Sequence, residues 1–80
     1  MPRYFFHSRG PVIGQHLIDR TGQQLPDVAS ARIIAVQAAQ DLVRLNPLEA
    51  WSGWVFDVVD GDGQIALIQP FTERKNRAGR

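Results

Sequence analysis

Three titratable side chains offer the most direct chemistry in this sequence: His7, His16 and Asp57. If residues 10–13 form a four-residue loop, His7 and His16 face each other across a hairpin, with Asp57 on the same side of the sheet. Two imidazoles and a carboxylate can ligate a divalent ion, and two adjacent histidines repel each other once protonated. Because a one-residue change of register separates the pair, we expect no metal site.

The other chemical motifs are incomplete. Asp60-Gly61-Asp62-Gly63 resembles a calcium loop, but placing Gly63 at the sixth position puts Val58 at the first, where a carboxylate is required. We interpret these four residues as a hairpin turn. No serine stands in a nucleophile motif, and no Gly-rich phosphate loop precedes a helix. We therefore predict a protein that is not an enzyme, with no catalytic residues, metal or cofactor.

Charge is concentrated at the C-terminal end. Residues 1–72 contain five arginines and seven acidic residues (−2), whereas residues 73–80 contain four bases and one acid (+3). The last eight residues have no apolar side chain larger than Ala78, which predicts a flexible, solvated basic tail. The alternative is contact with nucleic acid. The residues that such a contact would use are Arg74, Lys75, Arg77 and Arg80, together with Arg3, Arg9 and Arg32.

Composition indicates one small globular domain. The chain has 80 residues, of which 44% are hydrophobic and 21% charged, and it contains no cysteine, which excludes disulfides and thiol chemistry. No apolar run approaches the ~20 residues that span a bilayer, and the first residues lack the apolar stretch of a signal peptide. We expect a soluble, cytoplasmic protein with one domain over residues 1–72 and no membrane partner.

A helix is predicted over residues 28–45. Its apolar positions are separated by alternating intervals of three and four residues, which is the period of an amphipathic helix. They are Val28, Ala31, Ala35, Ala38, Leu42 and Leu45. Asp27 is a suitable N-cap, and Asn46-Pro47 ends the helix because the residue before proline avoids helical angles. The pattern predicts that Val28 and Leu42 are buried against a sheet.

Four strands are predicted over residues 3–9, 16–19, 54–59 and 64–71, giving an α+β fold of order ββαββ. One helix packs on a four-stranded antiparallel sheet, with 3–9 and 54–59 in the centre because a right-handed crossover steps over 3–9. With four-residue loops, Phe6 opposes Leu17 and Val58 opposes Ile65. The predicted core residues on the strands are Tyr4, Phe6, Leu17, Trp54, Phe56, Val58, Ile65, Leu67 and Phe71.

The second face of the sheet is the predicted functional surface. One helix covers one side only, and the other side keeps an apolar patch, which is typical of a partner surface. Its apolar members are Phe5, Ile18, Val55, Val59 and Ile68, with His7 and His16 beside them. We expect a small interaction or regulatory module that forms a homodimer or binds a protein partner. Protonation of the histidines below about pH 6 is expected to weaken the interface.

Three stretches form a signature: Met1-Pro2-Arg3-Tyr4-Phe5-Phe6-His7, then Leu17-x-Asp19-x-x-Gly22-x-x-Leu25-Pro26-Asp27, then Ala31-Arg32-x-x-Ala35. This signature resembles a family of small uncharacterised alphaproteobacterial proteins, classed as a domain of unknown function. The resemblance implies no activity and no binding residue. The ββα order and the Leu-Pro-Asp lead into an Ala-rich helix are also similar to the small domain of HicB-type antitoxins, which adds an antitoxin-like role to the nucleic-acid alternative.

Overall fold

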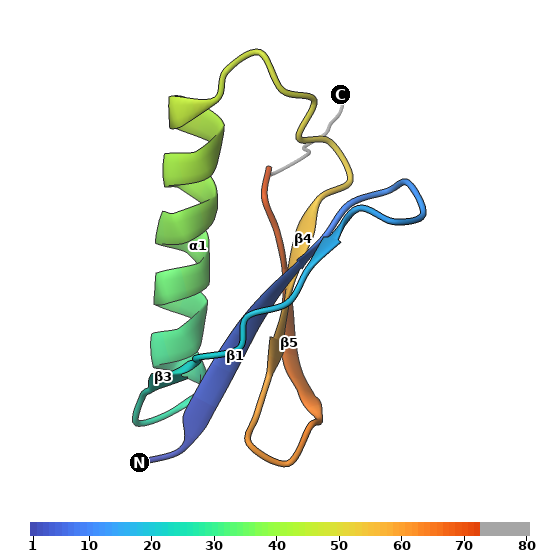
Figure 1. Ribbon diagram of the computed structural model, residues 1–80. Coiled ribbons are helices and arrows are strands. Elements are labelled where there is room, and N and C mark those ends of the chain that lie inside the picture. Colours follow the sequence, from blue (N-terminus) through green and yellow to red (C-terminus); the bar gives the residue numbers. More distant parts are fainter. Residues whose placement is uncertain (73–80) are drawn as a thin grey trace, which may run out of the picture.

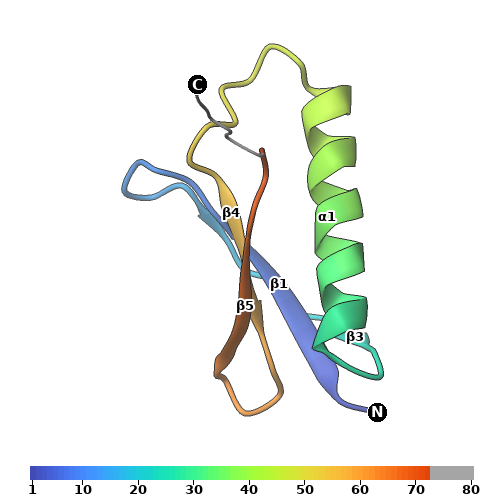
Figure 2. The same cartoon turned by 180° about the vertical axis from the view of Figure 1, so that it is seen from behind.

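The computed structural model describes residues 1–72 and consists of one helix packed on one side of an antiparallel sheet (Figures 1 and 2). The elements in chain order are β1 (Arg3–Arg9), β2 (His16–Leu17), β3 (Gln23–Gln24), α1 (Val28–Leu45), β4 (Val55–Val59) and β5 (Ile65–Pro70). The α+β class is confirmed. Within these residues, no helix is long and apolar enough to cross a membrane.

The strand order is β2-β1-β4-β5, and every neighbouring pair is antiparallel. This confirms the predicted order and the central position of β1 and β4. The sheet has one strand more than predicted, because β3 pairs with the start of β1 through Arg3–Gln24 and Tyr4–Gln23. The segment that returns from the first loop therefore pairs with β1 twice, first as β2 and then as β3, with a short interruption between the two strands.

The predicted registers are wrong in both hairpins, by two residues except next to the second turn, where the difference is one residue. Ser8, not Phe6, lies opposite Leu17, because the first loop runs over six residues from Gly10 to Gln15. In the second hairpin, Val58 lies opposite Leu67, and an irregularity between Val58 and Val59 shifts the register near the turn. A shift of two preserves which face a residue occupies, since side chains alternate with period two.

Two predicted core residues on the strands are exposed. The side chain of Leu17 is 66% exposed and that of Ile65 is 59% exposed. Leu17 lies on the short outer strand β2, whereas α1 contacts mainly β4 and β5 and does not extend over this edge. Ile65 follows the register irregularity, which turns it away from the covered face.

Local capping fixes both ends of α1. Asp27 is the N-cap, and its carboxylate accepts hydrogen bonds from the Ser30 N–H at 2.9 Å and the Ser30 hydroxyl at 2.8 Å. At the other end, the backbone and side-chain amides of Asn46 both donate to the Leu42 carbonyl at 3.0 Å. Both predicted boundaries are confirmed, because each depends on side-chain and backbone contacts only a few residues apart.

A stripe of small residues brings α1 onto the sheet. Ala31, Ala35 and Ala39 are fully buried, and Val58 is the large side chain of the core that is completely enclosed. The predicted burial of Val28 and Leu42 is wrong, since they are 37% and 36% exposed. Figure 1 shows β1 inclined to the helix, so that the strand diverges from α1 toward the C-terminal end of the helix.

Aromatic side chains fill the space between the segment after α1 and the end of the sheet where β4 begins and β5 ends. Phe71 lies 4.6 Å from Phe56, 5.4 Å from Trp51 and 6.0 Å from Trp54, measured between ring centroids. The Trp51 indole N–H donates to the Asn46 carbonyl at 3.0 Å. The cluster thus connects the C-cap of α1 to β4 and β5, and the predicted core positions of Trp54, Phe56 and Phe71 are confirmed.

Phe56→Ala is expected to destabilise the domain by about 3–5 kcal/mol, because Phe56 is buried and its ring contacts both Phe6 and Phe71. Urea unfolding followed by fluorescence measures this loss. Phe5→Ala is the matched control, because Phe5 lies on the sheet face that α1 does not cover and its side chain is only half-buried. An equal loss in both variants would contradict the assignment of the faces.

Asp27→Ala is expected to lower the melting temperature by about 4–8 °C, because the N–H of Ser30 loses its carboxylate acceptor. Thermal unfolding by circular dichroism measures the change. Asp27→Asn is expected to restore most of the stability, since an amide oxygen also caps a helix. If the asparagine variant melts as early as the alanine variant, charge and not capping is the contribution of Asp27.

Candidate functional site

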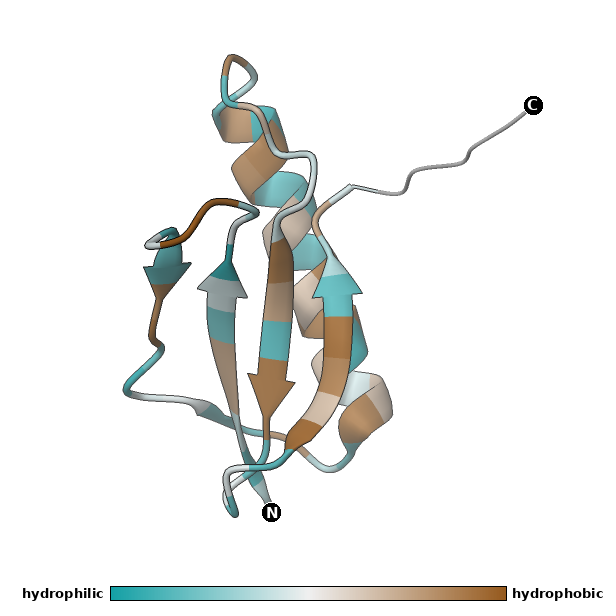
Figure 3. Ribbon diagram, turned by 90° about the vertical axis from the view of Figure 1, so that its right-hand side faces the viewer, coloured by the Kyte–Doolittle hydropathy of each residue, from teal (hydrophilic) through white to brown (hydrophobic). Residues whose placement is uncertain are grey.

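Within residues 1–72, no element covers the sheet face opposite α1, which we call the open sheet face (Figure 3). The register places Phe5 beside Val59, Asp57 beside Ile68, and Arg9 beside Val55, while the alternate residues of β1 and β4 are buried under the helix. The strands thus bring together four of the five apolar residues that the sequence predicted for this surface. The fifth, Ile18, lies directly after β2 and is exposed.

A bidentate ion pair occupies the middle of this face. Arg9 donates through Nε and Nη2 to the two carboxylate oxygens of Asp57, at 2.7 and 2.9 Å. The hydrogen bond from Arg9 lowers the pKa of Asp57 below its usual value, against the effect of partial burial. The same bond raises the pKa of the Arg9 guanidinium. The pair is neutral as a unit, and the register places the apolar residues Val55 and Ile68 directly opposite its two members.

His7 and His16 do not face each other, and that prediction is wrong. His16 lies opposite Arg9 and not opposite His7, because the first loop is two residues longer than expected. On its other side, His7 lies opposite Asp57 on β4. The Nδ1 atom of His7 accepts the Asp19 N–H at 3.0 Å, and its ring stacks on Phe5 at 6.4 Å. Among residues 1–72, no group of three or more histidine or acidic side chains is arranged to hold a metal ion.

Asp19 organises the edge of the sheet beside His7. Its Oδ2 accepts the Phe6 N–H at 3.1 Å, and its Oδ1 accepts the N–H groups of Thr21 and Gly22 at 3.0 and 3.1 Å. Partial burial alone would raise the pKa of Asp19, but these three backbone hydrogen bonds outweigh it and hold the pKa below its usual value. The carboxylate therefore fills the interruption between β2 and β3.

The bonds of Asp19 to the N–H groups of Thr21 and Gly22 are local and close a turn that begins at Asp19. Its bond to Phe6 spans 13 positions, and no local pattern indicates it. Gly22 has a φ of +72°, and a Cβ there would lie 2.8 Å from the Phe5 ring. The central residues of the signature thus position this loop and do not form a reactive site.

The Asp60–Gly63 segment forms the predicted hairpin turn. The Asp60 carboxylate accepts the N–H groups of Asp62 and Gln64 at 2.9 and 3.0 Å, and Gly63 has a φ of +83°. Asp60 is therefore directed at backbone donors of its own turn, in the manner of an Asx turn.

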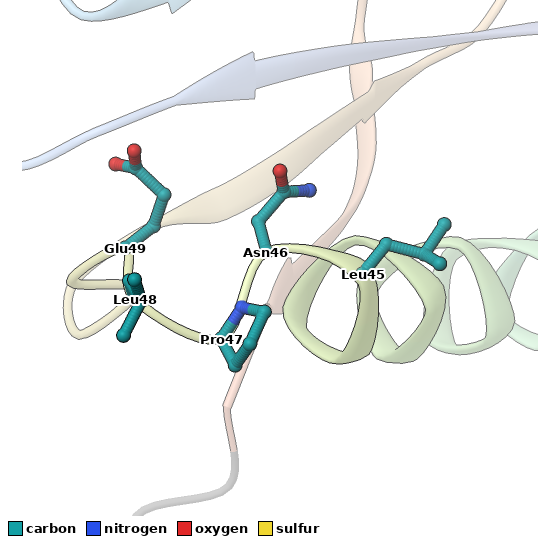
Figure 4. A pocket seen from close by; sticks show the side chains of 5 residues that line it. All are labelled: Leu45, Asn46, Pro47, Leu48 and Glu49. Atoms are coloured by element: carbon teal, nitrogen blue, oxygen red, sulfur yellow. The ribbon is translucent and has the colours of Figure 1, made fainter.

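A shallow pocket lies at the C-terminal end of α1 (Figure 4). Its lining residues are consecutive in the sequence: Leu45, Asn46, Pro47, Leu48 and Glu49. The Asn46 carbonyl already accepts the N–H of Glu49 at 3.1 Å and the indole N–H of Trp51 at 3.0 Å. The pocket therefore offers aliphatic surface beside one carboxylate, with no arrangement of groups for catalysis.

Two of the arginines considered for nucleic-acid contact are engaged within the fold. Arg3 donates to the Thr21 carbonyl at 2.9 Å, and Arg9 is paired with Asp57. Arg32 is exposed on α1. The four basic residues of the tail, Arg74, Lys75, Arg77 and Arg80, lie outside the described residues.

Asp19→Asn is expected to destabilise the domain at pH 7 by about 1–3 kcal/mol, because an amide accepts the three N–H groups less well than a carboxylate. The folded pKa of Asp19 is lowered, so its contribution is present above the unfolded value near 3.9 and is lost as the pH falls through the folded value.

Urea unfolding at a series of pH values from about 7 to 3 tests this expectation. The wild-type protein should lose stability below about pH 4, and the asparagine variant should lose less over the same range. Parallel pH profiles for the two proteins would contradict the assigned role of the Asp19 carboxylate.

Comparison with known proteins gives one match. No curated protein and no solved structure matches the chain. A family model described as a domain of unknown function, DUF6894, matches residues 3–72 and so includes all six elements of the fold. The chain therefore belongs to the DUF6894 family, whose members share a domain of unknown function.

Proposed function

We propose that this domain is a non-catalytic interaction module that associates with a second copy of itself through the open sheet face. The observation that carries the proposal is the composition of this face. Apolar side chains from β1, β4 and β5 lie side by side where α1 gives no cover. A solvent-facing sheet normally alternates with Thr, Lys or Glu at these positions.

The electrostatics of the face favour self-association. The charged side chains that the register places at its centre, Arg9 and Asp57, already neutralise each other with bidentate geometry. A second copy therefore does not have to supply a charge to compensate either of them, and burial leaves no unpaired ion in this pair. The remaining contacts are apolar, and their removal from water contributes about 25 cal/mol per Å² before the cost of association.

Solution mass tests the proposal. We expect the purified protein to have twice the monomer mass of 9.0 kDa, and Val55→Lys to convert it to the monomer because a lysine at this position cannot be buried against a second copy. Ile68→Lys serves as a second variant, since Asp57 lies opposite it and can pair with the new ammonium group in the folded monomer. Analytical ultracentrifugation measures all three proteins.

Ile33→Lys is the matched control, because Ile33 is an exposed isoleucine on α1, on the other side of the molecule. This variant is expected to remain dimeric. A wild-type protein that stays at 9.0 kDa at high concentration contradicts self-association. A dimer that persists in both sheet-face variants and dissociates in Ile33→Lys moves the interface to the helix.

A further inference from the structure

His7 connects the open sheet face to the Asp19 loop (residues 18–22, between β2 and β3). The residue lies on β1 opposite Asp57 and is half-buried. Its ring stacks on that of Phe5, with centroids 6.4 Å apart and planes inclined by 21°. Its Nδ1 atom accepts the Asp19 N–H at 3.0 Å. One imidazole therefore contacts an apolar side chain of the face and the backbone of the loop at the same time.

The bond from Asp19 determines where the imidazole of His7 carries its proton. A backbone N–H only donates, so Nδ1 offers a lone pair, and the proton of the neutral ring is on Nε2. A second proton turns Nδ1 into a donor as well. Two donors cannot share a contact of 3.0 Å, so either the ring or the Asp19 backbone moves when His7 is protonated.

The charged groups around His7 favour its protonated form without replacing the bond that protonation removes. They are Asp57 on β4, Arg9 on β1, His16 on β2 and Asp19 in the loop. The two carboxylates attract an imidazolium at His7. Their oxygens already accept hydrogen bonds, in Asp57 from Arg9 and in Asp19 from three backbone N–H groups. Protonation therefore adds a charge to the open sheet face and leaves the Asp19 N–H without its acceptor.

The Asp19 loop lies at the rim of the open sheet face. Ile18, an apolar residue of this face, directly precedes Asp19 and is 48% exposed. At the other end of the loop, the backbone of Gly22 lies so close to Phe5 that a Cβ would be 2.8 Å from the ring. A displacement of the loop therefore changes the surroundings of two apolar members of the face, Phe5 and Ile18.

We propose that His7 is a pH-sensitive contact: a proton on Nδ1 releases the Asp19 N–H, displaces the loop that carries Ile18 and weakens association through the open sheet face. The effect on association rests on the proposed function, whereas the release of the Asp19 N–H does not. Association weakens because burial of an imidazolium against a second copy is costly without new hydrogen bonds. Repulsion between two histidines is not the cause, since His16 lies opposite Arg9.

NMR spectroscopy of the ¹⁵N-labelled full chain tests the contact itself, between about pH 8 and about pH 5.5, where histidines titrate and carboxylates stay ionised. The Asp19 amide proton is expected to move upfield as the pH falls, because its bond to Nδ1 is lost. In His7→Asn the amide oxygen takes the place of Nδ1 as acceptor and does not titrate, so the Asp19 signal should stay constant. A wild-type Asp19 signal that does not move overturns the inference.

Analytical ultracentrifugation at the same two pH values tests the effect on association. The dissociation constant of the wild-type dimer is expected to be about tenfold larger at the lower pH, and that of His7→Asn to change by less than about twofold. His16→Asn is the matched control, because His16 is an exposed histidine on the neighbouring strand; it should keep the wild-type pH dependence. Circular dichroism checks that each variant is folded at both pH values.

Two results would assign the pH dependence of association to another group: its persistence in His7→Asn, or its loss in His16→Asn. A wild-type dimer with equal dissociation constants at both pH values also overturns the proposed regulation. If the wild-type protein is a monomer at about pH 8, the proposed function fails and the regulation of association fails with it. The Asp19 signal then decides independently whether protonation of His7 releases the loop.

Discussion

One constraint governs this fold: a single helix must cover a sheet that carries apolar side chains on both faces. The buried stripe of Ala31, Ala35 and Ala39 solves half of the problem, because small residues let the helix approach β4 and β5 closely enough to enclose Val58. Among residues 1–72, no element covers the other face, and the Arg9–Asp57 ion pair lies on it.

The outer edge of β1 is paired over only part of its length, because β2 and β3 each contribute two residues. A continuous strand would have supplied backbone acceptors along this edge, and the Asp19 carboxylate supplies one of them instead, to the Phe6 N–H. His7 completes the arrangement by accepting the Asp19 N–H. The signature residues Asp19, Gly22 and Asp27 are thus explained by loop geometry and helix capping.

The sequence was informative where the interactions are local. The helix boundaries follow from Asp27 and Asn46, whose caps reach only three or four residues along the chain. Strand order followed from composition and crossover handedness. The registers did not follow, because the length of the first loop depends on contacts such as Gly10 to Gln15 and Pro11 against Gly53. No pattern of residue types encodes those contacts.

The size of the register error determined which predictions about the site are correct. A displacement of two residues keeps the parity of a strand, so Phe5, Val55 and Val59 were placed on the correct face. The same displacement changes the cross-strand partners within the first hairpin, so the expected His7–His16 pair is replaced by Arg9–His16. The sequence therefore predicted which face of the sheet a side chain occupies. It did not predict which residue lies opposite that side chain, and a metal site depends on such specific neighbours.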